Sequence, residues 1–260
     1  MSRSLTPTIL RFDSLPSTND EAARQAAAGA PEGLCVVARE QTAGRGRQRR
    51  AWLSPRDAGL YVSVVLRPRF EQARWPLVTL AAALAVRDAL KEACGLTTDI
   101  KWPNDILARG RKVCGILAEV VETKAGRAAV VGIGVNLDER AFPPELRESA
   151  TSVAAETGSA PDAEEVLRAL TRTLAHRYAE LQHHDGAATT LRAWASHSSF
   201  AEGKRVRVAL AAETFEGHTR GLEPDGALRV ETDAGDIRIV RAGDVTAVRE
   251  VLRTEDCGLS

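Results

Sequence analysis

The apolar and polar positions divide the chain into two regions with different periodicities. Before about residue 200, short apolar runs bounded by turn residues alternate with segments whose apolar positions recur at helical spacing. The runs predict strands at residues 9–13, 34–39, 60–67, 98–102, 113–121 and 128–136. The periodic segments predict helices that start near Asp20 and stop at Gly29, and that cover 72–94, 161–182 and 187–196.

After Phe200 the pattern changes to short alternating strands separated by glycines. These strands are expected at residues 204–210, 213–224, 227–233 and 236–249. Many short strands with glycine turns are typical of small all-β units. We therefore predict a small C-terminal barrel of the SH3-like kind. With a boundary near residues 198–202, the chain divides into a catalytic domain at 1–199 and a second domain at 200–260.

Composition narrows the classes of protein that the chain could be. No apolar run approaches the roughly 18 residues that a membrane span needs, and the N-terminus lacks the apolar core of a secretion signal. We expect a cytoplasmic protein with no membrane role. The four cysteines (Cys35, Cys94, Cys114 and Cys257) lie far apart, which argues against a disulfide framework or a zinc site. They are expected to be reduced thiols.

Charge is balanced overall but concentrated at one place. The 35 Lys and Arg residues equal the 35 Asp and Glu residues, so no global field would hold nucleic acid. Residues 41–52 (QTAGRGRQRRAW) are a glycine-rich basic loop between two predicted strands. Glycines allow close backbone approach and arginines neutralise charge, so the loop favours a phosphate or carboxylate ligand. A solvated charged loop is the alternative; the P-loop pattern of nucleotide-binding proteins is not present.

Three further segments carry candidate chemistry. Residues 101–105 (KWPND) place an aromatic ring, a lysine, an amide and a carboxylate at a strand end, a set that could hold a nucleotide and Mg²⁺. Residues 111–119 (RKVCGILAE) put Lys112 at the mouth of a strand that contains Gly115. Residues 132–136 (GIGVN) interrupt another strand with two glycines. Glycines in neighbouring strands predict a flat binding floor.

These segments together resemble the bacterial biotin protein ligase family. The order STN (17–19), QTAGRGR…W, KWPND, KVCGILAE and GIGVN is similar to the family across residues 17–136. The resemblance implies an α+β fold with a mixed sheet flanked by helices, followed by the small β domain. It implies the substrates ATP with Mg²⁺ and biotin, which become biotinyl-AMP. The family's repressor form has a DNA-binding helix-turn-helix before these motifs; only sixteen residues precede Ser17, so we expect the monofunctional form and no DNA partner.

Site residues follow from the resemblance by position. The residues expected to bind the ureido ring of biotin are Ser17, Thr18, Asn19 and Gln41. The residues expected around the biotin carboxylate and the phosphate are Gly44, Arg45, Gly46 and Arg47. Lys112 is expected to contact the carboxylate and the α-phosphate, with Lys112 and Arg47 as the catalytic pair. Gly115 and Gly132 would line the biotin slot. The adenosine and Mg²⁺ environment would include Trp52, Asn104, Asp105 and Asn136, with Asp105 as the metal ligand and a candidate base.

Two departures and two alternative functions bear on this interpretation. The family usually has arginine and glycine where this chain has Gln48 and Arg49, which affects how the loop closes. A lipoate or octanoate ligase or transferase is the nearest alternative, and an RNA-binding module is a distant one. Cys114 is interpreted as a buried packing thiol rather than a nucleophile.

The resemblance also implies a protein partner. Biotin would pass from biotinyl-AMP to a lysine of a biotin carboxyl carrier protein, and a homodimer is left open. Because the adenylation motifs precede residue 137, deletion of 201–260 is expected to impair transfer more than adenylation.

Overall fold

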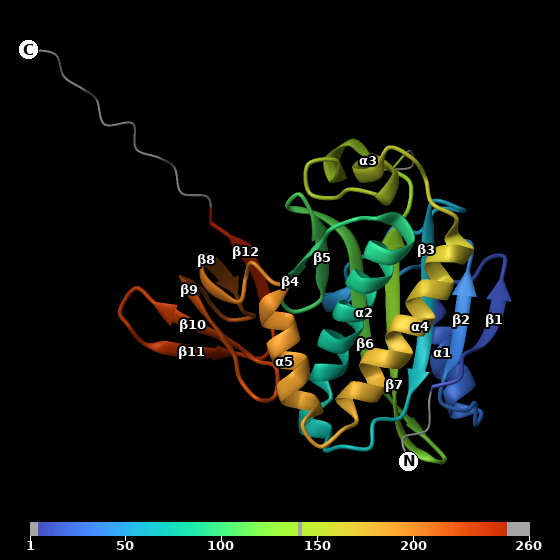
Figure 1. The fold of residues 1–260 in the computed structure, drawn as a ribbon, viewed down its shortest axis with the longest axis horizontal. Helices are drawn as coiled ribbons and strands as arrows, with labels where there is room; N and C mark the ends of the chain where they lie inside the picture. The colour runs from blue at the N-terminus through green and yellow to red at the C-terminus, as the bar shows by residue number, and fades with distance from the viewer. Residues whose placement is uncertain (1–4, 140–141, 249–260) are drawn as a thin grey trace, which may run out of the picture.

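The computed structural model describes residues 5–139 and 142–248, and its larger part is built on one seven-stranded sheet (Figure 1). In spatial order the strands are β1 (Thr8–Phe12), β2 (Leu34–Ala38), β3 (Gly59–Leu66), β7 (Gly126–Asn136), β6 (Arg111–Thr123), β5 (Asp105–Ala108) and β4 (Asp99–Lys101). β1 and β2 pair in parallel, and the other neighbours are antiparallel. The sheet is mixed, as the predicted fold class requires.

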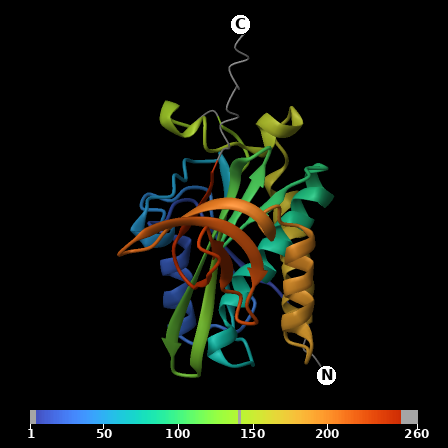
Figure 2. The same cartoon turned by 90° about the vertical axis from the view of Figure 1, so that its left-hand side faces the viewer.

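Helices cover the two faces of this sheet unequally. One face packs against α2 (Pro76–Cys94) and α4 (Ala163–Leu181), and α5 (Gly186–Ser196) packs on these two helices. The other face packs against α1 (Thr18–Ala27). Figure 2 shows α1 on one side of the strands and α2 and α5 on the opposite side. The large core lies under α2, whose leucines and alanines are buried on several sides, and a smaller core lies under α1. Because α1 covers only part of its face, the rest of that face is available for a site.

The C-terminal domain is an antiparallel sheet of five strands. In spatial order they are β11 (Ile237–Val240), β10 (Leu228–Thr232), β9 (Thr214–Leu222), β8 (Glu202–Ala209) and β12 (Asp244–Ala247). Within the described residues β11 and β12 do not pair with each other, so the predicted closed SH3-like barrel is not confirmed. The backbone at the start of β12 instead faces the larger domain, where Arg47 donates a hydrogen bond to the Gly243 carbonyl (3.3 Å).

Most predicted elements are confirmed within a few residues, and two short ones were missed. β5 follows directly on the KWPND turn, and α3 (Val153–Thr157) follows β7. The division into domains at residues 199 and 200 stays a prediction; α5 ends at Ser196 and β8 begins at Glu202. The single strand expected at 236–249 is two strands, β11 and β12, at opposite edges of the second sheet. Residue 249 and Cys257 lie outside the described residues.

The length and polarity of the helices bear on membrane crossing, and one buried side chain joins the two domains. Across residues 5–139 and 142–248, no helix is both long and apolar enough to cross a membrane. Trp102 anchors the two domains to each other, because its buried indole Nε1 donates to the Gly226 carbonyl at 3.0 Å.

Candidate active site

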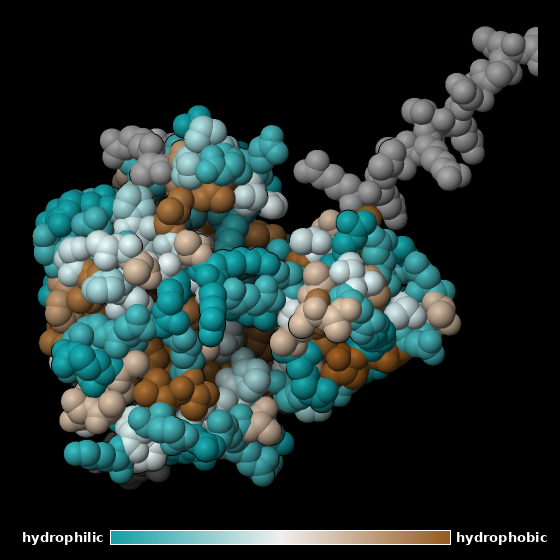
Figure 3. Space-filling model, turned by 180° about the vertical axis from the view of Figure 1, so that it is seen from behind, coloured by the Kyte–Doolittle hydropathy of each residue, from teal (hydrophilic) through white to brown (hydrophobic). Residues whose placement is uncertain are grey.

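A cavity of about 580 Å³ opens on the α1 face of the large sheet. It lies between the strands, the loop at residues 44–52 (called the arginine loop below) and the C-terminal domain. Figure 3 shows this side of the molecule, with a hollow between the larger body and the smaller domain. All the residues predicted from the sequence line this one cavity, with the exception of Gly44.

The first end of the cavity carries uncharged polar groups from the start of α1. Ser17 is the N-cap, and its side chain accepts a hydrogen bond from the Asp20 backbone N–H. Thr18 donates to Gln41 Oε1 from both its backbone nitrogen (2.8 Å) and its hydroxyl (3.0 Å). Gln41 Nε2 in turn donates to Ser54 Oγ at 2.8 Å. These bonds fix the side-chain orientations before any ligand binds.

Asn19 is buried beside the same group and lies directly over Gly132. Its Oδ1 is 2.6 Å from Ser63 Oγ, and its Nδ2 donates to the Leu117 carbonyl at 3.3 Å. A Cβ atom on Gly132 would lie only 2.2 Å from Asn19 Oδ1. Only glycine leaves room for this amide, so the glycine expected to line the slot has a specific steric reason.

The middle of the cavity has the flat glycine floor that the sequence predicts. Gly115 on β6 and Gly134 on β7 are direct cross-strand partners. The indole of Trp52 lies on them: a Cβ atom would be 3.0 Å from Trp52 Cζ3 at Gly115 and 2.4 Å from Trp52 Nε1 at Gly134. Trp52 Nε1 is buried and has no hydrogen-bond partner. The sequence predicted Gly134 as part of the floor but not as an individual site residue.

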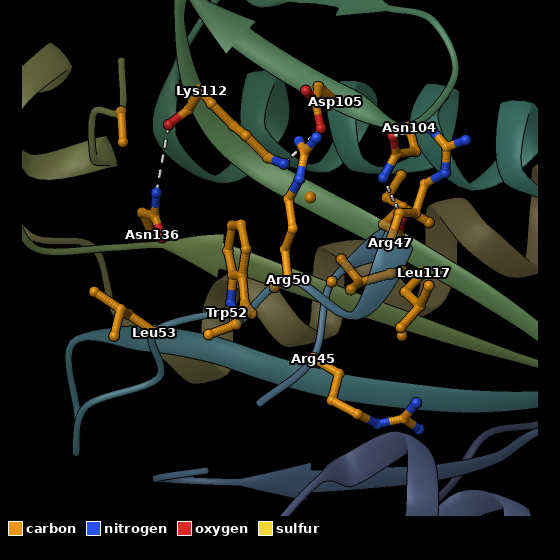
Figure 4. Close-up of a pocket in the computed structure, with 18 of the residues that line it drawn as sticks. Arg45, Arg47, Arg50, Trp52, Leu53, Asn104, Asp105, Lys112, Leu117 and Asn136 are labelled. Carbon is orange, nitrogen blue, oxygen red and sulfur yellow. Dashed lines mark hydrogen bonds and ion pairs between the residues drawn. The ribbon is translucent and has the colours of Figure 1, made fainter. Parts of the chain in front are cut away.

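The second end of the cavity is cationic. Lys112 Nζ lies 2.6 Å from Asp105 Oδ1 and 5.1 Å from the centre of the Trp52 ring, while Lys101 Nζ lies 3.6 Å from the other oxygen of Asp105 (Figure 4). Arg47 also reaches this end, where its Nη1 is 3.4 Å from Asn104 Oδ1. Desolvation lowers the pKa of Arg47 below its ordinary value, although Asp244 and Asp105 oppose the shift. An arginine remains charged under these conditions, so the end is well suited to anions.

The two asparagines predicted near the nucleotide have structural partners as well. Asn104 Nδ2 donates to the Ile116 carbonyl at 2.7 Å, which holds the KWPND turn against β6. Asn136 is buried and donates to the carbonyls of Thr151 (3.0 Å) and Lys112 (3.4 Å). Asn136 therefore fixes the backbone of Lys112 in addition to lining the cavity.

The arginine loop has a narrow base, and this explains the position of Gly44. The backbone N–H of Trp52 donates to the Gly44 carbonyl at 2.9 Å, and a Cβ atom on Gly44 would lie 2.4 Å from the Trp52 carbonyl oxygen. Gly44 therefore allows the two ends of the loop to meet and is not among the residues that line the cavity, and its expected place around the biotin carboxylate stays a prediction. At the tip, Gln48 (φ 54°) and Arg49 (φ 59°) are both left-handed. Arg49 thus adopts a glycine-favouring conformation at the position where the family usually has glycine.

Several lining residues were missed, and all of them except Arg50 lie outside the quoted motifs. They are Arg50, Leu53, Phe142, Leu146, Ser149, Ala150, Phe200, Asp244, Thr246 and Ala247. Arg50 could have been found as a member of the arginine cluster. The C-terminal residues could not, because nothing in their sequence places β12 beside the arginine loop.

The structure bears on the predicted role of Cys114 and on the residues available to bind a metal ion. Cys114 is fully buried, and burial raises the pKa of its thiol, which fits packing rather than nucleophilic chemistry. Residues 5–139 and 142–248 contain no group of three or more His, Cys, Asp or Glu side chains that could hold a metal ion. One carboxylate, Asp105, fits a Mg²⁺ ion that arrives on substrate phosphates, because such ions need only one or two protein carboxylates.

Comparison with known proteins gives matches over both domains. Residues 11–136 match the Biotin/lipoate A/B protein ligase family, and residues 203–246 match the Biotin protein ligase C terminal domain. The chain is 38% identical over 240 residues to the Bifunctional ligase/repressor BirA of Bacillus subtilis, covering 91% of this chain and 73% of that protein. It is 35% identical over 239 residues to a Biotin--[acetyl-CoA-carboxylase] ligase of Mycobacterium tuberculosis, covering 90% and 86% of the two chains.

A solved structure agrees with these relatives. The biotin protein ligase from Aquifex aeolicus in complex with biotin and ATP superposes with a TM-score of 0.80 at 28% identity, covering 94% of this chain and all of that one. The class of protein is therefore defined: the chain belongs to the Biotin/lipoate A/B protein ligase family. Its C-terminal match and its relatives place it among the biotin protein ligases of that family.

Proposed function

We propose that this protein activates biotin with ATP to biotinyl-5′-AMP and transfers the biotin to a lysine of a biotin carboxyl carrier protein. One observation carries the proposal. A single cavity has fixed uncharged polar groups at one end, a glycine floor in the middle, and Lys112 and Arg47 at the other end. This matches a substrate with a neutral polar ring, an apolar chain and a carboxylate that must meet a phosphate.

The first half-reaction joins two anions. An oxygen of the biotin carboxylate attacks the α-phosphorus of ATP, and the bond to the departing pyrophosphate breaks. Lys112 and Arg47 offset the repulsion between the anions and stabilise the charge that develops on the α-phosphate. Lys112 is paired with Asp105 at 2.6 Å, so the substrate must compete with that carboxylate for the ammonium group. Mg²⁺ bound to the nucleotide phosphates, with Asp105 as its protein ligand, would supply further charge neutralisation.

The second half-reaction forms the amide. The amine of the carrier lysine attacks the acyl carbon of biotinyl-AMP, the carbon–oxygen bond breaks, and AMP leaves. A free lysine has a pKa of about 10.4, so the amine must lose a proton before it attacks. Asp105, which is only 17% exposed and lies 2.6 Å from Lys112, is the base that we propose. The arginine loop would exclude water and so protect the intermediate from hydrolysis.

The experiment that tests this function mixes the purified protein with biotin, MgATP and a biotin carboxyl carrier domain. Blotting with streptavidin is expected to show biotin on the carrier only when ATP is present. Parallel reactions with lipoate or octanoate, in which hydroxylamine traps any acyl-adenylate, test the nearest alternative. An adenylate from lipoate and none from biotin would overturn the proposal. A cytoplasmic location, where ATP is available, forms part of this proposal.

A further inference from the structure

A carboxylate outside the residues discussed so far joins two parts of the site. Glu119 on β6 accepts a hydrogen bond from Asn19 Nδ2 at 2.7 Å. Its two oxygens also accept from Arg45, whose Nη1 and Nη2 lie at 3.1 Å and 3.2 Å. Glu119 thus connects the start of α1 with the arginine loop, although the two segments come from different parts of the chain.

Glu119 determines whether the oxygen or the nitrogen of the Asn19 side-chain amide is available to a ligand. An asparagine side chain can present either an oxygen or an NH₂ group, and its partners determine which. The Glu119 carboxylate and the Leu117 carbonyl can only accept hydrogen bonds, so Nδ2 must face them and both of its protons are used. Oδ1 has Ser63 as its partner and retains a second lone pair. Asn19 therefore offers the cavity an acceptor and no donor.

Glu119 also explains where the side chain of Arg45 points. The Arg45 guanidinium projects away from Lys112 and Asp105, whereas Arg50 extends toward them (Figure 4). Asp20 adds a second carboxylate, 2.5 Å from Arg45 Nη2. Arg45 is thus held by two acids at the side of α1, and it fastens the arginine loop there. The loop backbone beside it is thereby fixed relative to Asn19.

We infer that Glu119 is a positioning residue for biotin: it fixes Asn19 as a hydrogen-bond acceptor for a ureido N–H and anchors the arginine loop through Arg45. This inference rests on the proposed function. It also bears on selectivity, because the ureido ring of biotin carries N–H groups and the dithiolane ring of lipoate carries none. A site that presents a buried acceptor leaves that acceptor unpaired when a ring without N–H groups enters.

The test compares Glu119→Gln with Glu122→Gln. Glu122 lies on the same strand and also pairs with an arginine, Arg127; neither glutamate lines the cavity, and of the two it is Glu119 that accepts a hydrogen bond from Asn19. Biotin binding without ATP is measured by calorimetry, and adenylate formation is followed by pyrophosphate release. Glu119→Gln is expected to raise the Kd and KM for biotin about 10- to 100-fold, the effect of losing a hydrogen bond to a charged group. Its kcat at saturating biotin should stay within about threefold of wild type, and Glu122→Gln should change neither constant.

A double-mutant cycle separates positioning from general structural support. If Glu119 acts through the amide, Glu119→Gln should change biotin affinity far less in an Asn19→Ala background than in the wild type. Should Glu119→Gln fail to fold, Glu119→Asp keeps the charge but withdraws the oxygen from Asn19, and the same shift is expected. Wild-type affinity in a folded Glu119 variant, or equal losses in both backgrounds, would overturn the inference. A wild-type protein that neither binds biotin nor forms the adenylate would overturn the proposed function, and the inference with it.

Discussion

Arg50 and Asp244 form an ion pair that links the arginine loop to the C-terminal domain. Both side chains line the cavity, and Arg47 adds a hydrogen bond from the same loop to the Gly243 carbonyl. The C-terminal domain therefore forms part of the cavity wall. Deletion of 201–260 is thus expected to reduce adenylation as well as transfer, which differs from the expectation based on the positions of the motifs alone.

The ion pair predicts how the arginine loop responds to a single substitution. Asp244→Asn should increase the rate of trypsin cleavage at residues 45–50 about two- to fivefold, because a largely exposed ion pair contributes at most about 1 kcal/mol. Biotin with MgATP should slow cleavage in both proteins. Asp233→Asn removes one of the two carboxylate partners of Arg205, in the same domain but outside the cavity, and serves as the control. Equal cleavage rates in all three proteins would show that Asp244 does not restrain the loop.

Lys112 is predicted to act in adenylation and not in folding. Its side chain is 31% exposed, so Lys112→Ala should leave the melting temperature close to that of wild type. The rate of pyrophosphate release should fall about 10²- to 10³-fold, as it does when one preorganised donor to a developing charge is lost. Lys91→Ala, in the last turn of α2 and outside the cavity, should be unaffected. A folded Lys112→Ala protein with near-normal release would remove Lys112 from the reaction.

Two glycines on β7 are predicted to affect different parts of the cavity: Gly132 the end with Asn19, and Gly134 the floor under Trp52. In Gly132→Ala the new methyl group would lie 2.2 Å from Asn19 Oδ1, so Asn19 must move and the KM for biotin should rise at least about tenfold. In Gly134→Ala the methyl group would displace the Trp52 indole instead, which should alter tryptophan fluorescence and the KM for ATP. Steady-state kinetics with each substrate varied in turn distinguishes the two. If both variants changed the KM for biotin and the KM for ATP to the same extent, Gly132 and Gly134 would not serve different substrates.

The stability of the protein is predicted to fall at alkaline pH, partly through Cys35. Burial raises the pKa of this thiol from 9.0 to about 11. The folded protein keeps the thiol neutral while the unfolded chain ionises, so this contribution is complete below pH 9 and is lost between pH 9 and 11. Two pKa units correspond to about 3 kcal/mol. Denaturant unfolding at pH 8 and pH 10.5 should show a smaller loss of stability for Cys35→Ala than for wild type. Cys94→Ala, which keeps Cys35 and removes only a half-buried thiol, should lose nearly as much as wild type.

Local sequence patterns predicted the secondary structure well, because in most elements the spacing of apolar residues matches the face that the element buries. Leu77, Leu80 and Leu84 recur at helical spacing and lie in the buried helix α2. The antiparallel C-terminal domain was predicted, but a closed barrel is not confirmed, because alternation specifies strands and does not specify whether the edge strands pair. β11 and β12 stay apart, and β12 lies beside the arginine loop.

The site was predictable only where its residues occur in compact motifs. Lys112, Asp105 and Trp52 were found in this way, and they lie together as expected. Glu119 belongs to a quoted motif, but its role depends on Asn19, which is one hundred residues away in sequence and in contact only after folding. Such pairings depend on sheet topology, and no local pattern carries that information.

The Trp52 indole lies on Gly115 and Gly134, so the rate at which this ring moves is expected to limit the rate of ligand binding. Trp52 covers the floor, and its buried N–H without an acceptor costs about 1–3 kcal/mol, so the indole is held there less firmly than a fully paired group. A ligand that needs this floor must wait until the ring moves. Rapid-mixing measurements should therefore show an observed rate that rises with ligand concentration and then reaches a plateau, and the plateau measures how often the ring leaves.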